Sequence, residues 1–231
     1  MGRMVLVAAG GAMVFGGLAA WLRRAPAERV VRGGTHDGTL LDDVCPDFEF
    51  AGVESVEVNA PPAAVFEAIR RVTLAEMPVA RALGTLRYLP GILLGRVRPR
   101  ADGRPFVEGL GVVLAEAPKR EVVIGMAGRL HDLVDQRPVP FTSADEYARF
   151  ADPSYQKFVQ SFRVEPPGGD WVRLVAAHRT HALSEESRRK FRPYWRLLVG
   201  PGSGVMLRGL LDAIKRRAEA EASRTRSRQE V

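Results

Sequence analysis

The side chains best suited to chemistry are histidines and carboxylates in the second half of the chain. His178 and His181 lie three residues apart, and His131 is followed by Asp132 and Asp135. Imidazole nitrogens and carboxylates can hold a zinc ion or transfer protons. However, residues three apart on a strand point to opposite faces, so the first two histidines would not converge on one ion. We therefore expect no metal site, and we interpret His131 and Asp132 as an exposed pair at a strand end.

Other catalytic motifs are absent from the sequence. It contains no G-x-S-x-G nucleophile motif, no phosphate-binding glycine loop and no Cys/His zinc spacing. Cys45 is the only cysteine, which excludes an internal disulfide. The run Gly200–Gly204 precedes a helical pattern but lacks the Lys-Ser/Thr ending of a phosphate loop, and we interpret it as a helix-breaking hinge. We expect no cofactor.

The basic composition says little about function. The chain has 34 Lys and Arg against 27 Asp and Glu, a formal net charge of +7. Such a charge could suit nucleic acid, an anionic membrane surface or solubility alone. Basic residues gather between Lys215 and Arg228, but Glu219 and Glu221 dilute them. We interpret this region as a solvated face and expect no nucleic-acid partner, with contact to a membrane surface as the alternative.

An uncharged apolar run lies near the N-terminus. Met4–Leu22 comprises nineteen residues without a charge, which is within the lower range for a membrane-spanning helix. One arginine precedes the run and four follow it between positions 23 and 32, a bias that favours a cytoplasmic body. We expect an N-terminal transmembrane anchor at residues 1–24. A cleaved signal peptide and an ordinary apolar leader are the alternatives.

The remaining chain fits one folded domain of ordinary size. Residues 25–47 contain paired glycines, an acidic pair and a proline, and we expect a linker there. The folded domain is expected over residues 48–222, and residues 223–231 form a basic polar tail. The oligomeric state is left open.

The first part of the domain predicts one strand followed by two short helices. Residues 53–59 end in the alternation of a half-buried strand, which stops at two prolines. Proline is tolerated in a first helical turn, and apolar spacing predicts a helix over 61–72. Thr73–Glu76 fits a capping box, so a second helix begins there and restarts after Pro78. Residues 86–105 combine prolines, glycines and an Asp-Gly pair, so we expect a loop that contains at most one strand or helical turn.

The second part predicts antiparallel strands. Four runs have strand-like composition or alternation: 106–115, 121–130, 155–165 and 171–181. The first two and the last two are expected to form hairpins, the latter across the strong turn signal at 166–170. Between the hairpins, Ser143 and Glu146 could cap a short helix.

Two apolar stripes follow near the C-terminus. Their helical spacing is i, i+3, i+4, i+7: Phe191, Tyr194, Trp195 and Leu198, then Leu207, Leu210, Leu211 and Ile214. Gly200–Gly204 separates them and lets them take different directions. The element order therefore predicts an α+β domain in which a curved antiparallel sheet packs on a long C-terminal helix that this hinge could break.

Three stretches resemble the START-like, or helix-grip, superfamily. Residues 56–66 (VEVNAPPAAVF) resemble its strand-to-helix entry, and residues 155–181 resemble its late hairpin. Phe191–Trp195 together with Gly202–Gly204, Arg208 and Leu211 resembles the C-terminal segment of uncharacterised bacterial SRPBCC-type, polyketide cyclase-like members. The resemblance covers residues 48–222 and implies a helix-grip fold.

The resemblance also implies an internal cavity between the sheet and the terminal helix, used in relatives for apolar or amphipathic small molecules. Relatives often carry Thr-Glu-Thr-Arg on the late strand, where this chain has Ala176, Ala177, His178 and Arg179. Only the arginine matches, so no role of the acidic residue transfers to this chain. A shared fold implies no shared reaction.

Apolar residues on one face of each strand are the candidate lining of that cavity. Together with the C-terminal helix, the candidates are Val122, Ile124, Met126, Phe158, Phe162, Leu174, Ala176, His178, Trp195, Leu207 and Leu211. We expect a membrane-tethered protein that binds a hydrophobic or amphipathic small molecule without catalysis. The alternatives are a cyclase-like or hydrolase-like enzyme that uses His178, and an interaction module whose cavity is filled by its own side chains.

Overall fold

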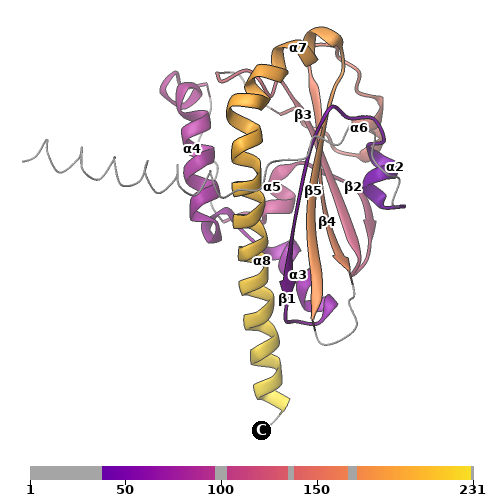
Figure 1. Cartoon of the computed structure of the whole chain (residues 1–231), viewed down its shortest axis with the longest axis vertical. Helices are drawn as coiled ribbons and strands as arrows, with labels where there is room; N and C mark the ends of the chain where they lie inside the picture. Colours follow the sequence, from indigo (N-terminus) through magenta and orange to yellow (C-terminus); the bar gives the residue numbers. More distant parts are fainter. Residues whose placement is uncertain (1–37, 97–102, 135–137, 166–170, 230–231) are drawn as a thin grey trace, which may run out of the picture.

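The computed structural model describes residues 38–96, 103–134, 138–165 and 171–229 (Figure 1). The predicted anchor at 1–24 and most of the predicted linker lie outside the described residues. Within the described ranges, no single helix has the length and hydropathy needed to cross a bilayer. One pair of helical segments, Glu185–Leu197 and Gly202–Arg228, meets the criterion jointly by length and composition, but it is bent by 70°.

The centre of the fold is a five-stranded antiparallel sheet. In chain order the strands are β1 (Phe50–Val58), β2 (Val112–Ala117), β3 (Glu121–Gly128), β4 (Gln156–Glu165) and β5 (Val172–Ala182). Their spatial order is β1-β5-β4-β3-β2, so the last strand pairs with the first. The two predicted hairpins, β2–β3 and β4–β5, are confirmed. In the second hairpin Phe162 lies opposite Ala176, and Phe158 lies opposite Thr180.

Helices cover both faces of this sheet (Figure 1). They are α2 (Leu40–Val44), α3 (Pro62–Arg71), the 3-10 turn η1 (Leu74–Glu76), α4 (Pro78–Leu93), α5 (Phe106–Leu110), α6 (Ala144–Arg149), α7 (Glu185–Tyr194), the π-helical turn η2 (Trp195–Val199) and α8 (Gly200–Gln229). α8 runs along one face, which we call the inner face, and packs on β1, α3 and α4. α2 and α6 contact the sheet from the opposite, outer side. The predicted α+β helix-grip architecture is confirmed.

The C-terminal helix forms a continuous but bent cover. Leu207, Leu210, Leu211 and Ile214 are all buried in the main core, as the second apolar stripe predicts. Gly200–Gly204 does not interrupt the helix, because these residues lie within α8, but the predicted hinge is present as a bend. The change of direction is still present, since Glu185–Leu197 and Gly202–Arg228 meet at 70°. α8 also continues through most of the predicted polar tail.

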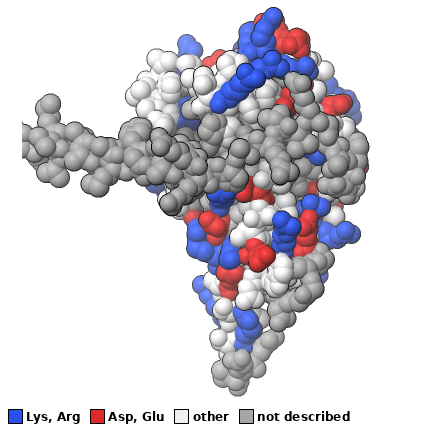
Figure 2. Space-filling view, in the orientation of Figure 1, with Lys and Arg blue, Asp and Glu red and all other residues white. Residues whose placement is uncertain are grey.

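Acidic partners accompany the basic residues of α8. Arg217 pairs with Glu76 at 2.9 Å, and Lys215 lies 3.8 Å from Glu219. Figure 2 shows red and blue side chains interspersed around the lower part of α8 on the face in view. On that face, the charges are mixed, as expected for a solvated face, and they do not form a continuous basic patch.

Two expectations for the middle of the chain are wrong. The predicted loop at 86–105 begins as helix, because α4 continues to Leu93 across Pro90. A proline in the last turn removes a single backbone hydrogen bond, while Ala80 and Gly91 remain buried on the side that packs. The predicted strand at 106–115 begins instead with α5. A short apolar run does not distinguish helix from strand, and here Val107 is buried in the core.

The interval predicted as a linker also contains the folded helix α2. Thr39 and Asp42 form a reciprocal capping box at its N-terminus. Arg179 on β5 donates to the carbonyls of Leu41 and Cys45, and it pairs with the Asp42 carboxylate at 2.6 Å. The hydrogen bonds to Arg179 and Thr39 lower the pKa of Asp42 against the opposing effect of burial. The matched arginine of the late strand therefore holds a helix terminus on the outer face.

Candidate functional site

The inner face of the sheet divides into two ends. Seven of the eleven predicted lining residues belong to one core cluster in which each is at most 4% exposed: Val122, Ile124, Phe162, Leu174, Ala176, Leu207 and Leu211. Phe162 also receives the ring of Phe106 edge-on at 6.4 Å between centroids. These side chains interlock with one another and with α3 and α8. We call this region the Phe162 end.

The other four predicted residues gather where β3, β4 and β5 approach α7 and η2. His178 stacks on Phe158 with ring centroids 5.7 Å apart, and it lies 5.8 Å from the ring of Trp195. Met126 and Phe158 belong to the same cluster as Trp195 and Phe191. Although both face inward, Met126 and Phe158 are only partly buried. We call this incompletely covered region the His178 end.

Burial determines the charge of His178. The residue is 3% exposed, and desolvation lowers its pKa to about 4. The imidazole is therefore neutral at physiological pH. A pKa this far below neutrality suits a polar group that orients a ligand better than a general acid or base working near pH 7.

Two other histidines lie within the described residues. His181 points to the outer side, where its Nδ1 lies 3.5 Å from Glu49, so the predicted divergence from His178 is confirmed. His131 lies beside the side chain of Gln156, and Asp132 accepts from the backbone of Val134. Asp135 lies outside the described residues. Within the described ranges, no group of three potential metal ligands occurs.

Two polar residues at the His178 end were missed as site candidates. Among the described residues, the buried hydroxyl oxygen of Tyr194 has no hydrogen-bond partner. Burial raises the pKa of Tyr194, which keeps this hydroxyl protonated. The guanidinium of Arg87, on α4, lies 5.3 Å from the Tyr194 ring centroid and donates to the carbonyl of Leu130 at 3.1 Å. Tyr194 was hidden in an apolar stripe, and Arg87 in a segment predicted as a loop.

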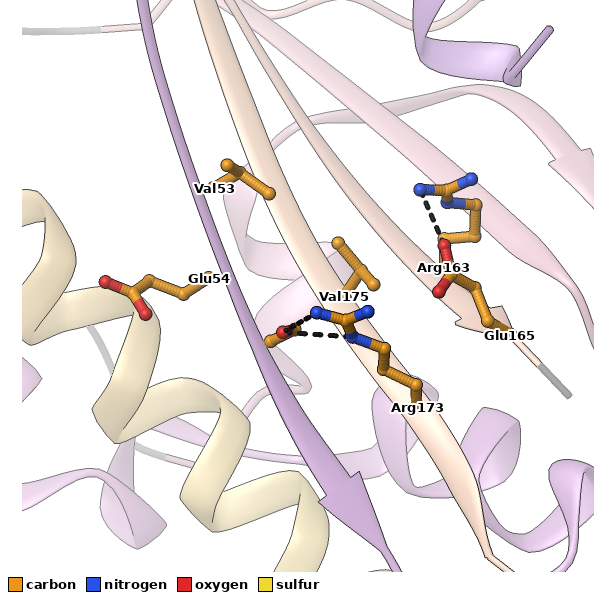
Figure 3. A pocket seen from close by; sticks show the side chains of 7 residues that line it. Val53, Glu54, Arg163, Glu165, Arg173 and Val175 are labelled. Atoms are coloured by element: carbon orange, nitrogen blue, oxygen red, sulfur yellow. Dashed lines mark hydrogen bonds and ion pairs between the residues drawn. The ribbon is translucent and has the colours of Figure 1, made fainter. Parts of the chain in front are cut away.

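A separate open pocket of about 330 Å³ lies at the other side of the sheet, between the middle of β1 and the hairpin ends of β4 and β5 (Figure 3). Its charged residues pair locally: Arg163 with Glu165 at 2.8 Å, and Arg173 with the hydroxyl of Ser55 at 3.2 Å. Glu54 points away from the others toward α8, where it meets Arg208 at 3.3 Å (Figure 3). This shallow, polar pocket does not resemble a site for an apolar molecule.

Comparisons with known proteins give only distant structural likenesses. No protein-family model and no curated protein matches this sequence. Among solved structures, a hypothetical protein from Helicobacter pylori is 8% identical, with 81% of this chain and 99% of that chain covered and a TM-score of 0.40. Truncated norcoclaurine synthase from Thalictrum flavum is 15% identical over 72% and 91% of the two chains, with a TM-score of 0.31.

An aromatase/cyclase from Streptomyces sp. R1128 is 14% identical over 74% and 97% of the two chains, with a TM-score of 0.27. These values carry no functional argument. The fold assignment rests on the strand order and on the position of α8.

Proposed function

We propose that this protein binds a hydrophobic or amphipathic small molecule at the His178 end, between the sheet and the C-terminal helical segment. The observation that supports the proposal most strongly is the contrast in burial along one face. The inner face is sealed at Phe162, whereas Met126 and Phe158 retain exposure beside a buried neutral imidazole. Apolar walls around a few polar groups are typical of small-molecule sites.

The polar groups at this end supply the orientation that such a ligand needs. A buried hydroxyl without a partner is costly unless a ligand or a water molecule satisfies it. The Tyr194 hydroxyl could donate to a ligand oxygen, while Phe158 and Trp195 contact its apolar part. We therefore expect a ligand with one polar end, and we assign the candidate lining to Met126, Phe158, His178, Tyr194 and Trp195.

Catalysis at the same site has less support. Because its pKa is low, His178 has no proton to donate as an acid near neutral pH, and it is a weak base there. The alternative of a cyclase-like or hydrolase-like enzyme would be supported by turnover that is lost in His178→Ala. The alternative of a filled interior would be supported by the absence of any bound molecule.

Native mass spectrometry of the full chain tests the binding proposal. We expect added mass after incubation with a total lipid extract, and we expect its loss in Met126→Trp, which fills the partly covered end. Val53→Trp is the matched control, because Val53 is 64% exposed on the outer face. Equal retention of the added mass in both variants would contradict a site at the His178 end.

The membrane tether is a separate part of the proposal. It rests on the nineteen uncharged residues at 4–22 and on the arginines that follow them, which favour a cytoplasmic body. Fractionation of cells that express the full chain is the test. We expect the chain in the membrane fraction and release by detergent, and recovery in the soluble fraction without detergent would contradict the tether.

A further inference from the structure

Helix α4 has apolar residues on two sides, and only one side packs against the protein. Ala80 and Gly91 are buried, and Arg87 reaches from the same side to Tyr194. The opposite side carries Val79, Ala82, Leu86, Leu89 and Leu93, all exposed, which we call the α4 stripe. At 3.6 residues per turn these five positions fall within about 80° of the helix circumference.

The exposure of the α4 stripe is large for apolar side chains. Leu93 is 77% exposed, Leu86 is 60% exposed and the adjoining Leu94 is 62% exposed. Single exposed leucines are common on protein surfaces, but a continuous stripe along sixteen helical residues indicates an interaction surface. On η2, whose preceding residue Tyr194 contacts α4 through Arg87, Leu197 is 81% exposed.

Charge favours one kind of partner for this surface. Between Pro78 and Leu93 the chain has two arginines and no acidic residue. Arg192 and Arg196, on α7 and η2, are exposed, and within the described ranges neither forms an ion pair. Figure 2 shows a largely uncharged surface at α4, with blue side chains and some red ones beside it over α7. A second copy would bring the same positive charge, whereas an anionic lipid surface would complement it.

We propose that the α4 stripe, together with Leu197, Arg192 and Arg196, docks on an anionic lipid bilayer. Apolar side chains of a helix that lies in the plane of the interface enter the headgroup region, and flanking arginines contact anionic headgroups. Docking through the stripe leaves the other side of α4, from which Arg87 reaches Tyr194, facing the protein. The surface acts whether or not the interior holds a ligand.

The test places an environment-sensitive fluorophore on the full chain at Leu93→Cys. The native Cys45 is buried, and its pKa is raised to about 11, so the exposed new thiol reacts selectively. Vesicles contain phosphatidylcholine with or without phosphatidylserine, plus nitroxide-labelled lipid as a quencher. Ala148→Cys, exposed on α6 at the outer side, is the matched control position.

We expect at least a twofold loss of fluorescence at position 93 with phosphatidylserine vesicles and no loss at position 148. An N-terminal anchor alone would hold the chain on vesicles without quenching position 93, and that result would overturn the proposal. Failure of the labelled chain to bind the vesicles would overturn the proposal as well. Because the measurement reports depth at α4, it is independent of the mass-spectrometric test of the interior ligand.

Other occupants of the stripe give different results before vesicles are added. A second copy on the stripe would double the solution mass and shield position 93 from aqueous iodide. A segment of the same chain, such as residues 4–22, would shield position 93 in a monomer. Either result would overturn docking on lipid.

A charge variant sharpens the result. In Arg192→Gln/Arg196→Gln, we expect half-maximal quenching at position 93 to require more phosphatidylserine, since each basic residue near an anionic surface contributes about fivefold to binding. Arg224→Gln/Arg226→Gln makes the same change in net charge near the far end of α8 and should leave the requirement unchanged. If both variants needed the same extra phosphatidylserine, the effect would depend on net charge alone, and this would contradict a docking face at α4.

Discussion

The two ends of the inner face are built from the same kinds of residue but differ in what covers them. At the Phe162 end, α3, α5 and the leucines of α8 close over the strands. At the His178 end, aromatic rings from α7 and η2 replace those leucines, and Met126 and Phe158 remain partly exposed. The comparison indicates that burial on a shared strand face depends on the helix opposite, so one strand can serve both a core and a binding site.

The largest effect we predict separates two phenylalanines on one strand. Phe162 and Phe158 lie four residues apart on the inner face of β4, but only Phe162 is fully buried. Phe162→Ala should lower the free energy of unfolding by about 4 kcal/mol, because it leaves a cavity in a sealed core. Phe158→Ala should cost about 2 kcal/mol or less. Urea denaturation measures both, and equal losses would erase the distinction between the ends.

The next effect concerns pH. The folded pKa of His178 is about 4, below its ordinary value of 6.5, so the unfolded chain binds the proton first as pH falls. The stability contributed by the neutral imidazole is complete above pH 6.5, and about 3 kcal/mol of it is lost as the pH falls to 4. His178→Phe should remove this part of the pH dependence in calorimetry.

Carboxylates provide the background for that comparison. The pKa values of Asp42, Glu49 and Glu76 are lowered in the fold, so their contributions are present above their ordinary values and are lost at more acidic pH in both proteins. The difference between wild type and His178→Phe isolates the imidazole. Identical profiles between pH 6.5 and 4 would show that His178 is hydrated, which contradicts its placement in the interior.

The smallest effect separates ligand binding from stability. Tyr194→Phe removes a buried hydroxyl that has no partner in the described part of the chain, so the free energy of unfolding should stay within about 1 kcal/mol of the wild-type value or rise. The affinity for the ligand should fall about fivefold if the hydroxyl donates to it. Chemical denaturation and a binding titration on the same samples measure both. A clear loss of stability with unchanged affinity would assign the hydroxyl to the fold.

The sequence predicts the sheet better than the helices around it. Alternation over β4 and β5, joined by a Pro-Gly turn, has one consistent explanation, and it places Phe158, Phe162 and His178 on one face correctly. Around α4, the glycines and Pro90 indicate a loop locally, whereas packing on α8 stabilises a helix. The spacing of Val79, Leu86 and Leu93 is the signal that could have revealed it.

Helix α2 and the two-ended inner face had weaker signals in the sequence. For α2, the pattern Thr39-Leu40-Leu41-Asp42 is a capping box that encloses two leucines, but the surrounding glycines favour a linker. The division of the inner face into two ends could not be predicted, because alternation gives the direction of a side chain and not the helix that covers it. Tyr194 and Arg87 come from α7 and α4, which are far apart in the sequence, so their contact depends on the tertiary fold.

The most direct test of a ligand site at the His178 end compares two methionines by methyl NMR of the full chain. Met126 is partly buried at the His178 end, and Met77 is 2% exposed in the sealed core. During titration with a long-chain fatty acid, we expect a saturable shift of the Met126 methyl signal while the Met77 signal stays in place. A Met126 signal that does not move, or two signals that move equally, would contradict it.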